Sequence, residues 1–212
     1  MKKVIVAIDS FKGSASSVGA SVAACRGILE IFPGAKVIGV PIADGGEGTV
    51  DAFFTATSYI EGEKEYGKRQ GEYILREVTG PDFQTVSAKY CILPDGKTAV
   101  VEMAQASGLT LTTVKKAGQA TTYGTGELIC DAVKRGCKKI IIGIGGSATN
   151  DCGIGALSAM GVKFIDKDGN TVKPCGDELP KVDKIETSEM TERIRECEII
   201  LACDVTNTTV LL

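Results

Sequence analysis

The amino-acid sequence predicts an α/β fold that is built from parallel-sheet units of the Rossmann-like or flavodoxin-like kind, with a second α/β segment after the first. Two observations predict this class. Residues 2–43 alternate strand, helix and strand, and residues 138–145 (KKIIIGIG) form a short unbroken apolar run that ends in glycine. Such a run is typical of a parallel strand that is covered on both faces.

The first segment predicts a β-α-β unit. Residues 2–9 (KKVIVAID) read as a strand, a helix is expected from about Ser17 to Ile31 because Pro33 and Gly34 stop it, and residues 35–43 form the next strand. A further helix is expected from Val50, with Thr49 able to cap it.

After Tyr59 the pattern changes. Residues 61–72 are charged and glycine-spaced, which is typical of a solvated loop or linker. Two strand-like runs follow, and the turn at residues 94–96 (PDG) predicts a hairpin. From Thr121 the α/β pattern resumes, with a helix over 127–136, the strand at 138–145, a strand at 162–166, a helical stretch near 189–196 and a last strand at 198–205.

Charge and composition exclude several classes of function. The net charge is −3 and the basic residues are scattered along the chain. The chain therefore lacks the basic patch of proteins that bind nucleic acids or anionic membranes, and we exclude these classes. No apolar run approaches the roughly 20 residues of a membrane span, and residues 1–10 do not resemble a signal peptide, so we expect a cytoplasmic protein.

The eight cysteines and the absence of histidine restrict the kinds of metal site and catalytic mechanism that the chain can have. No C-x-x-C pair occurs and no histidine could complete a common zinc site, so we expect reduced thiols. Without histidine, Ser-His-Asp and Cys-His hydrolases are excluded. Acid–base catalysis therefore falls to carboxylates or lysine.

The stretch at residues 142–153 (IGIGGSATNDCG) predicts a ligand site, because a strand runs straight into glycines and oxygen-bearing side chains. Consecutive N–H groups in such a turn bind anions, and hydroxyl, amide and carboxylate oxygens suit Mg²⁺. The alternative is a glycine-rich turn in which Asn150 or Asp151 caps the helix containing residues 155–160. The candidate residues are Gly145, Gly146, Ser147, Thr149, Asn150 and Asp151.

A second interpretation of the same stretch is a dinucleotide site. Gly143, Gly145 and Ala148 match G-x-G-x-x-A, and Asp166 ends the next strand-like run at about the Rossmann spacing. This pattern predicts a dinucleotide-dependent oxidoreductase, but it is easily produced by chance.

Two further loops follow the first two predicted strands, and the carboxyl ends of neighbouring parallel strands meet at one edge of a sheet. We expect these loops to share a cleft, with Lys12 offsetting anionic charge and Asp9 or Asp44 binding a metal or accepting a proton. The alternative is a capped turn with Lys12 in solvent. The candidates are Asp9, Lys12 and Ser14 in DSFKGS, and Asp44, Gly45, Gly46 and Glu47 in ADGGEGT.

Two other segments with oxygen-bearing side chains are further candidates for ligand binding. Thr122, Gly124 and Thr125 lie at the expected start of a helix, where unpaired N–H groups favour anions. Asp204 and Asn207 follow the last predicted strand, where Asp204 could complete a metal or base site. A turn-forming pair explains Asp204 and Asn207 equally well.

Five blocks of this sequence resemble the glycerate kinase family of the bacterial D-glycerate type, in the family's order. The blocks are DSFKGS at 9–14, PIADGGEGTVDA at 41–52, TTYGTGELI at 121–129, IGIGGSATND at 142–151 and ACDVTN at 202–207. The resemblance implies ATP-dependent phosphorylation of D-glycerate to 2-phosphoglycerate or 3-phosphoglycerate, with ATP and Mg²⁺. It also implies two α/β domains, with residues 71–212 inserted in a domain that begins with residues 1–70.

Phosphoryl transfer needs mainly alignment and charge neutralisation, so we hypothesise roles for individual residues of the intact fold. Asp44 or Asp204 would receive the proton of the glycerate hydroxyl, Lys12 would offset anionic charge, and the loop at residues 147–151 would bind phosphate and metal. The candidate metal ligands are Asp151, Asp204 and Asn207. The resemblance covers only about the amino-terminal half of the family's length, so the two-domain fold is expected to be incomplete at its carboxyl end. The alternative is therefore a non-catalytic, truncated remnant that binds ligand or forms a homodimer through exposed surface.

Overall fold

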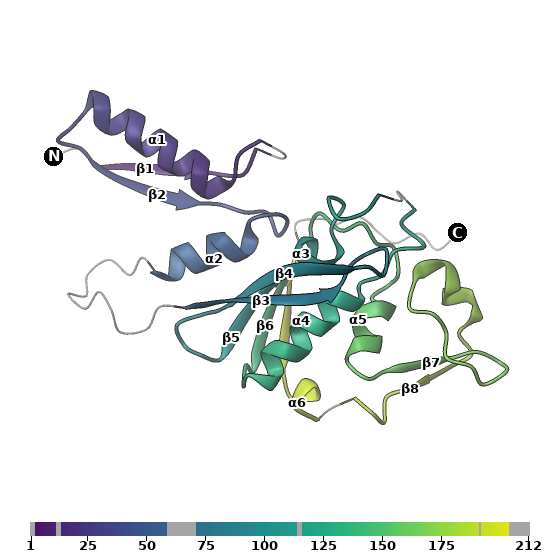
Figure 1. Cartoon of the computed structure of the whole chain (residues 1–212). Coiled ribbons are helices and arrows are strands. Elements are labelled where there is room, and N and C mark those ends of the chain that lie inside the picture. The colour runs from purple at the N-terminus through teal and green to yellow at the C-terminus, as the bar shows by residue number, and fades with distance from the viewer. Residues whose placement is uncertain (1–2, 12–13, 59–70, 114–115, 191, 204–212) are drawn as a thin grey trace.

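The computed structural model describes residues 3–11, 14–58, 71–113, 116–190 and 192–203. Figure 1 shows a small amino-terminal unit beside a larger body that is built around one sheet. The elements, in chain order, are β1 (Lys3–Ile8), α1 (Ser17–Ile31), β2 (Lys36–Pro41), α2 (Thr49–Ser58), β3 (Glu72–Thr79), β4 (Thr85–Ile92), β5 (Thr98–Glu102), α3 (Met103–Ser107), α4 (Tyr123–Lys134), β6 (Lys139–Gly143), α5 (Ile154–Ala159), β7 (Lys163–Ile165), η1 (Gly176–Lys181), β8 (Lys184–Glu186), α6 (Glu192–Arg195) and β9 (Glu198–Ala202).

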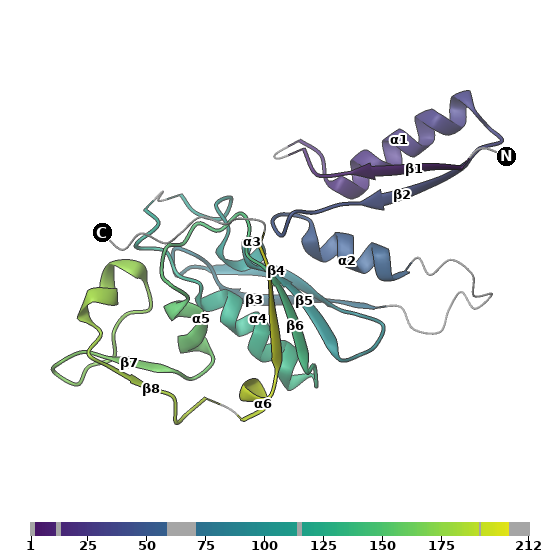
Figure 2. The same cartoon turned by 180° about the vertical axis from the view of Figure 1, so that it is seen from behind.

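The amino-terminal unit confirms the predicted β-α-β pattern. Strands β1 and β2 pair in parallel from Lys3 opposite Lys36 to Ile8 opposite Pro41. Helix α1 begins where Ser16 accepts the N–H of Gly19 at 3.1 Å. Helix α2 then lies between this unit and the large sheet, as Figures 1 and 2 both show.

The α/β fold is confirmed, and the large sheet is mixed: it combines the predicted parallel strands with an antiparallel part. Its strand order is β3-β4-β5-β6-β9. Strands β5, β6 and β9 run parallel, whereas β3, β4 and β5 pair antiparallel. The antiparallel part follows from the predicted hairpin at residues 94–96, which is confirmed. Asp95 accepts the N–H groups of Lys97 and Thr98 at 2.9 Å each, and Gly96 takes a positive φ of 66°.

Both faces of the sheet are covered at its centre. All five residues of β5 are buried. Ala99 and Val101 pack in the main core with Leu128 of α4, while Val100 packs on the opposite face against Val50 of α2. The central parallel strands thus lie between α4 and α2, as their continuous apolar sequences predict.

The Rossmann interpretation of the glycine pattern is wrong. A Rossmann unit needs a crossover helix that returns to a parallel strand of the same sheet. Helix α5 has only six residues, and β7 instead pairs antiparallel with β8 in a separate two-stranded sheet.

Some shorter elements differ from the prediction or were not predicted. Helix α3 and the 3₁₀ helix η1 carry no clear sequence signal, and the helical stretch expected near 189–196 shortens to α6. Within the described ranges, no helix combines the length and the apolar character that a membrane crossing requires.

Asp131 on α4 links the helix to the antiparallel strands. Its carboxylate accepts the hydroxyl of Tyr90 at 2.7 Å and pairs with Arg76 at 3.0 Å and Arg135 at 2.9 Å. Partial burial alone would raise the pKa of Asp131, but the hydrogen bonds from Arg76, Tyr90 and Arg135 outweigh it and lower this pKa to about 2.

We therefore predict that Asp131→Asn lowers the free energy of unfolding by about 2 kcal/mol at pH 7. Because the folded-state pKa lies below the unfolded value of about 3.9, this stabilisation is present above pH 4 and is lost as the pH falls toward 2. Urea unfolding at several pH values measures it. Tyr90→Phe, which keeps the carboxylate, should cost only about 1 kcal/mol. A difference between wild type and Asp131→Asn that stays constant from pH 7 to pH 2 would contradict the prediction.

Candidate functional site

The site is built on the carboxyl ends of three neighbouring parallel strands. Glu102 of β5, Gly143 of β6 and Ala202 of β9 lie side by side in the sheet register. The loop at residues 44–48, which follows β2, lies against this row, and the carbonyl of Gly45 accepts the N–H of Gly145 at 2.9 Å. Segments that are far apart in the sequence therefore meet here.

Close backbone contact explains the glycines at this junction. A Cβ added at Gly143 would lie 2.5 Å from the carbonyl oxygen of Gly45, and one at Gly145 would lie 2.7 Å from Cα of Gly46. Gly45 has a φ of +91°, and a Cβ there would lie 2.7 Å from the carbonyl oxygen of Ala202. Only residues without a side chain allow these backbones to approach so closely.

The 44–48 loop carries two exposed carboxylates, Asp44 and Glu47. Asp44 accepts the N–H of Gly46 at 3.0 Å through Oδ1. The expected cap by Thr49 is not formed. Helix α2 begins at Thr49 itself, whose hydroxyl donates to the carbonyl of Gly46 at 2.7 Å and so closes the loop.

The first helical turn of α2 is bound instead by Glu102, a residue that the sequence analysis did not select. Glu102 is fully buried, and its Oε2 accepts the N–H groups of Gly48 at 3.1 Å and Val50 at 3.3 Å. Burial raises the pKa of Glu102, although these hydrogen bonds act in the opposite direction. The sequence does contain a signal for Glu102, because this carboxylate ends the otherwise uncharged run TAVVE.

The second loop, residues 145–149, continues from the same row. Gly146 takes a positive φ of 72°, and the hydroxyls of Ser147 and Thr149 lie 2.6 Å apart. The loop is fixed to the end of α3, because the N–H of Ala148 donates to the carbonyl of Ser107 at 2.9 Å. It thus places two half-buried hydroxyls and a glycine turn beside the 44–48 loop.

Asp151 has structural contacts in this fold. It is buried, and its Oδ2 accepts the N–H and the hydroxyl of Thr122 at 2.9 and 2.8 Å and the N–H of Gly155 at 3.2 Å. Oδ1 accepts the N–H of Gly153 at 3.0 Å. These contacts support the helix-capping alternative for Asp151 and give no support to a metal role. Asn150, its neighbour, is exposed.

The segment around Thr122 is packed inside the protein. Thr122 and Thr125 are both buried, and the Thr125 hydroxyl lies 3.0 Å from that of Ser107. A Cβ added at Gly124 would collide with the carbonyl oxygen of Thr79. The structure therefore places Thr122, Gly124 and Thr125 in the packing around α4, and their role in binding stays a prediction.

The loop after β1 is only partly described. The N–H of Ile42 donates to the carbonyl of Ile8 at 3.1 Å, so the chain segments leading to Asp9 and Asp44 leave neighbouring strand ends. Asp9 and Ser14 are exposed. Lys12, Asp204 and Asn207 lie outside the described residues.

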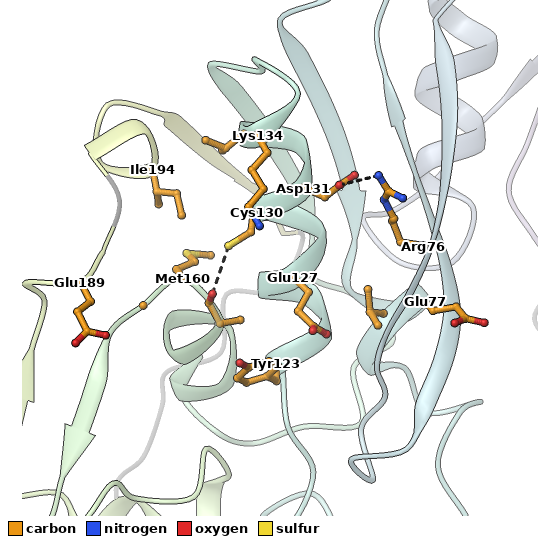
Figure 3. Close-up of a pocket in the computed structure, with 14 residues that line it drawn as sticks. Arg76, Glu77, Tyr123, Glu127, Cys130, Asp131, Lys134, Met160, Glu189 and Ile194 are labelled. Atoms are coloured by element: carbon orange, nitrogen blue, oxygen red, sulfur yellow. Dashed lines mark hydrogen bonds and ion pairs between the residues drawn. The ribbon is translucent and has the colours of Figure 1, made fainter.

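A separate cavity of about 670 Å³ lies along α4, and it contains none of the predicted site residues. Figure 3 shows its charged side chains, several of which are engaged by other groups. Asp131 pairs with Arg76, and Glu127 accepts the N–H of Thr79 at 2.7 Å. These pairings indicate that the charged residues of the cavity stabilise the fold.

Comparison with known proteins identifies the family. A sequence model described as the glycerate kinase family matches residues 4–210. The chain belongs to the glycerate kinase family. It is 44% identical over 207 residues to a glycerate 2-kinase of Escherichia coli K12, which covers 97% of this chain and 51% of the relative. A glycerate kinase of Bacillus cereus gives the same identity and coverage.

The fold is shared with a solved family structure. A crystal structure from Salmonella typhimurium LT2, assigned as a glycerate kinase 2, superposes with a TM-score of 0.80 at 40% identity. It covers 98% of this chain and 53% of that one. The chain therefore spans about half the length of the glycerate kinases it matches.

We predict that Gly145→Ala destabilises the protein by about 1–3 kcal/mol, because the new methyl group would overlap the backbone of Gly46. Gly27→Ala in α1 is the matched control, since nothing lies within 4 Å of a Cβ at that position. In a helix interior that change should stabilise by up to about 1 kcal/mol. Urea unfolding of both variants tests the contact, and equal stability changes would contradict it.

Proposed function

We propose that this chain carries out ATP-dependent phosphorylation of D-glycerate, giving 2-phosphoglycerate or 3-phosphoglycerate. The observation that supports it most directly is the docking of the 44–48 loop on the glycines of the 143–147 segment. Phosphoryl transfer needs mainly alignment and charge neutralisation, which loops lined with amides, hydroxyls and carboxylates supply without histidine. Family membership supports the same reaction.

The side chains at this junction fit a nucleotide phosphate with Mg²⁺. Asp44, Glu47, Ser147 and Thr149 offer oxygen atoms, and the glycine turn at Gly146 brings backbone close to a ligand. In the part of the chain that is described, no three carboxylate, thiol or imidazole groups gather into a metal cage. Mg²⁺ is commonly held by one or two carboxylates together with phosphate oxygens, so such a cage is not required.

We assign the role of general base to Asp44, with Asp204 as the other candidate, and charge neutralisation to Lys12. Asp44 suits this role because it is exposed beside the glycine junction and its Oδ1 is held by the N–H of Gly46. We also infer that residues 1–70 and 71–212 belong to two domains. Helix α2 packs on β2 of the first and on β5 of the second and would join them.

The test is a coupled assay of ADP release. We expect turnover that depends on D-glycerate, and we expect Asp44→Asn to lower kcat by 10²–10⁴-fold, the usual contribution of a general base. Asp168→Asn, an exposed turn carboxylate, is the control and should leave kcat unchanged. Full activity of Asp44→Asn would exclude the base assignment.

Exposed apolar side chains favour a second candidate, a non-catalytic protein that binds ligand or forms a homodimer. Ile5 on β1 and Leu201 on β9 are 63% and 61% exposed, and Ile199 is also exposed. Apolar patches of this kind commonly mark interaction surfaces. Ligand binding without turnover, together with a dimer mass by light scattering, would favour this candidate, whereas an active compact monomer would exclude it.

A further inference from the structure

Glu102 occupies an unusual position for a carboxylate. It ends the central strand β5, is 0% exposed, and points its Oε2 at the backbone of the 44–48 loop and α2. Its other oxygen lies 3.5 Å from Nε2 of Gln105. Among the ion pairs found in the described ranges, none includes Glu102.

The groups that Glu102 binds need an acceptor. The first N–H groups of a helix have no partner within the helix, and the positive end of the helix dipole favours an anion there. The Thr49 hydroxyl, which could have served α2, is directed to Gly46 instead. Glu102 supplies the missing acceptor, although it lies 52 positions after Val50 in the sequence.

This contact holds one end of the 44–48 loop. Gly48 is the last residue of the loop. Near its other end, Gly45 contacts the backbones of Gly145 and Ala202 at the carboxyl ends of β6 and β9. One end is therefore held by backbone contact and the other by the Glu102 carboxylate. Asp44 precedes this doubly held segment, so its position depends on both attachments.

A buried carboxylate that has no cation partner among the described residues costs free energy to keep ionised. Removing a charge from water costs free energy unless a partner compensates it, and two amide hydrogen bonds compensate only in part. Burial also raises the pKa of Glu102, which is the expected sign of this cost. Charge-assisted hydrogen bonds are about twice as strong as neutral ones, so the ionised form of Glu102 would hold the loop more tightly than a neutral acceptor would.

We propose that Glu102 is the positioning residue of the 44–48 loop, which it holds against the ends of β5, β6 and β9 so that Asp44 faces the glycine junction. The loop-holding role stands on the contacts alone, and its consequence for catalysis rests on the proposed kinase function.

The test measures amide hydrogen exchange by NMR at Gly48 and Val50. We expect Glu102→Ala to accelerate exchange at these two amides at least 10-fold, with less than a 2-fold change at Ile140 in the core. Glu102→Gln keeps the shape but offers a neutral acceptor, and should give an intermediate acceleration of about 5-fold. In the same variants kcat for D-glycerate should fall in the same order, with the alanine variant slower than the glutamine variant.

The matched control is Glu127→Ala. Glu127 also accepts a backbone N–H from a distant strand, that of Thr79, but it lies away from the loop. Exchange should accelerate at Thr79 and stay unchanged at Gly48 and Val50.

Unchanged exchange at Gly48 and Val50 in both Glu102 variants would overturn the proposal, and so would an equal acceleration throughout β5 and β6. If the alanine variant does not fold, the glutamine variant decides by the same criterion. Absence of wild-type turnover would count against the kinase function alone, because the exchange result does not depend on activity.

Discussion

The contact between the backbones of Gly45–Gly46 and Gly143–Gly145 is the constraint on which the rest of the site depends. Because these glycines lack side chains, the loop after β2 can lie directly on the carboxyl ends of β5, β6 and β9. The same contact joins the small amino-terminal unit to the large sheet, with α2 packed between them. Residues that are about 100 positions apart in the sequence thereby share one surface.

The polar groups at this surface follow from the same geometry. Asp44 and Glu47 are exposed because the glycines beside them occupy the buried side of the loop. Ser147 and Thr149 remain half-buried because Ala148, between them, is tied to α3. Glu102 is buried because it fills the space under the start of α2. A site of oxygens and amides results, which suits phosphate chemistry.

Much of the fold could be predicted from local patterns. The apolar period and Pro33-Gly34 defined α1, and the turn at Asp95-Gly96 defined a hairpin. What local patterns could not show was long-range pairing. The run at residues 163–165 is strand-like wherever it pairs, so its departure into a separate sheet with β8 was not visible in the sequence. The predicted hairpin likewise did not show that its strands would join β6 and β9 in one sheet.

The structure brings part of the predicted candidate site together, and other candidate residues have structural contacts for a common reason. The glycine clusters were expected to bring backbone close to a ligand, and in the structure Gly45 and Gly145 bring the backbones of two loops together. The same residue types at Gly124 and Asp151 serve helix packing and capping, because polar side chains and glycines satisfy buried backbone as readily as they bind ligands. Glu102 was missed because its partners are distant in sequence.

The most direct test of the account is a titration of ¹⁵N-labelled protein with ATP, Mg²⁺ and D-glycerate, followed by NMR chemical shifts. If ligands bind at the glycine junction, the largest changes fall on the amides of Gly45, Gly46, Gly145 and Ser147. The account would be contradicted if those amides stayed unchanged while the changes gathered along the outer cavity of α4, at Glu127 and Asp131.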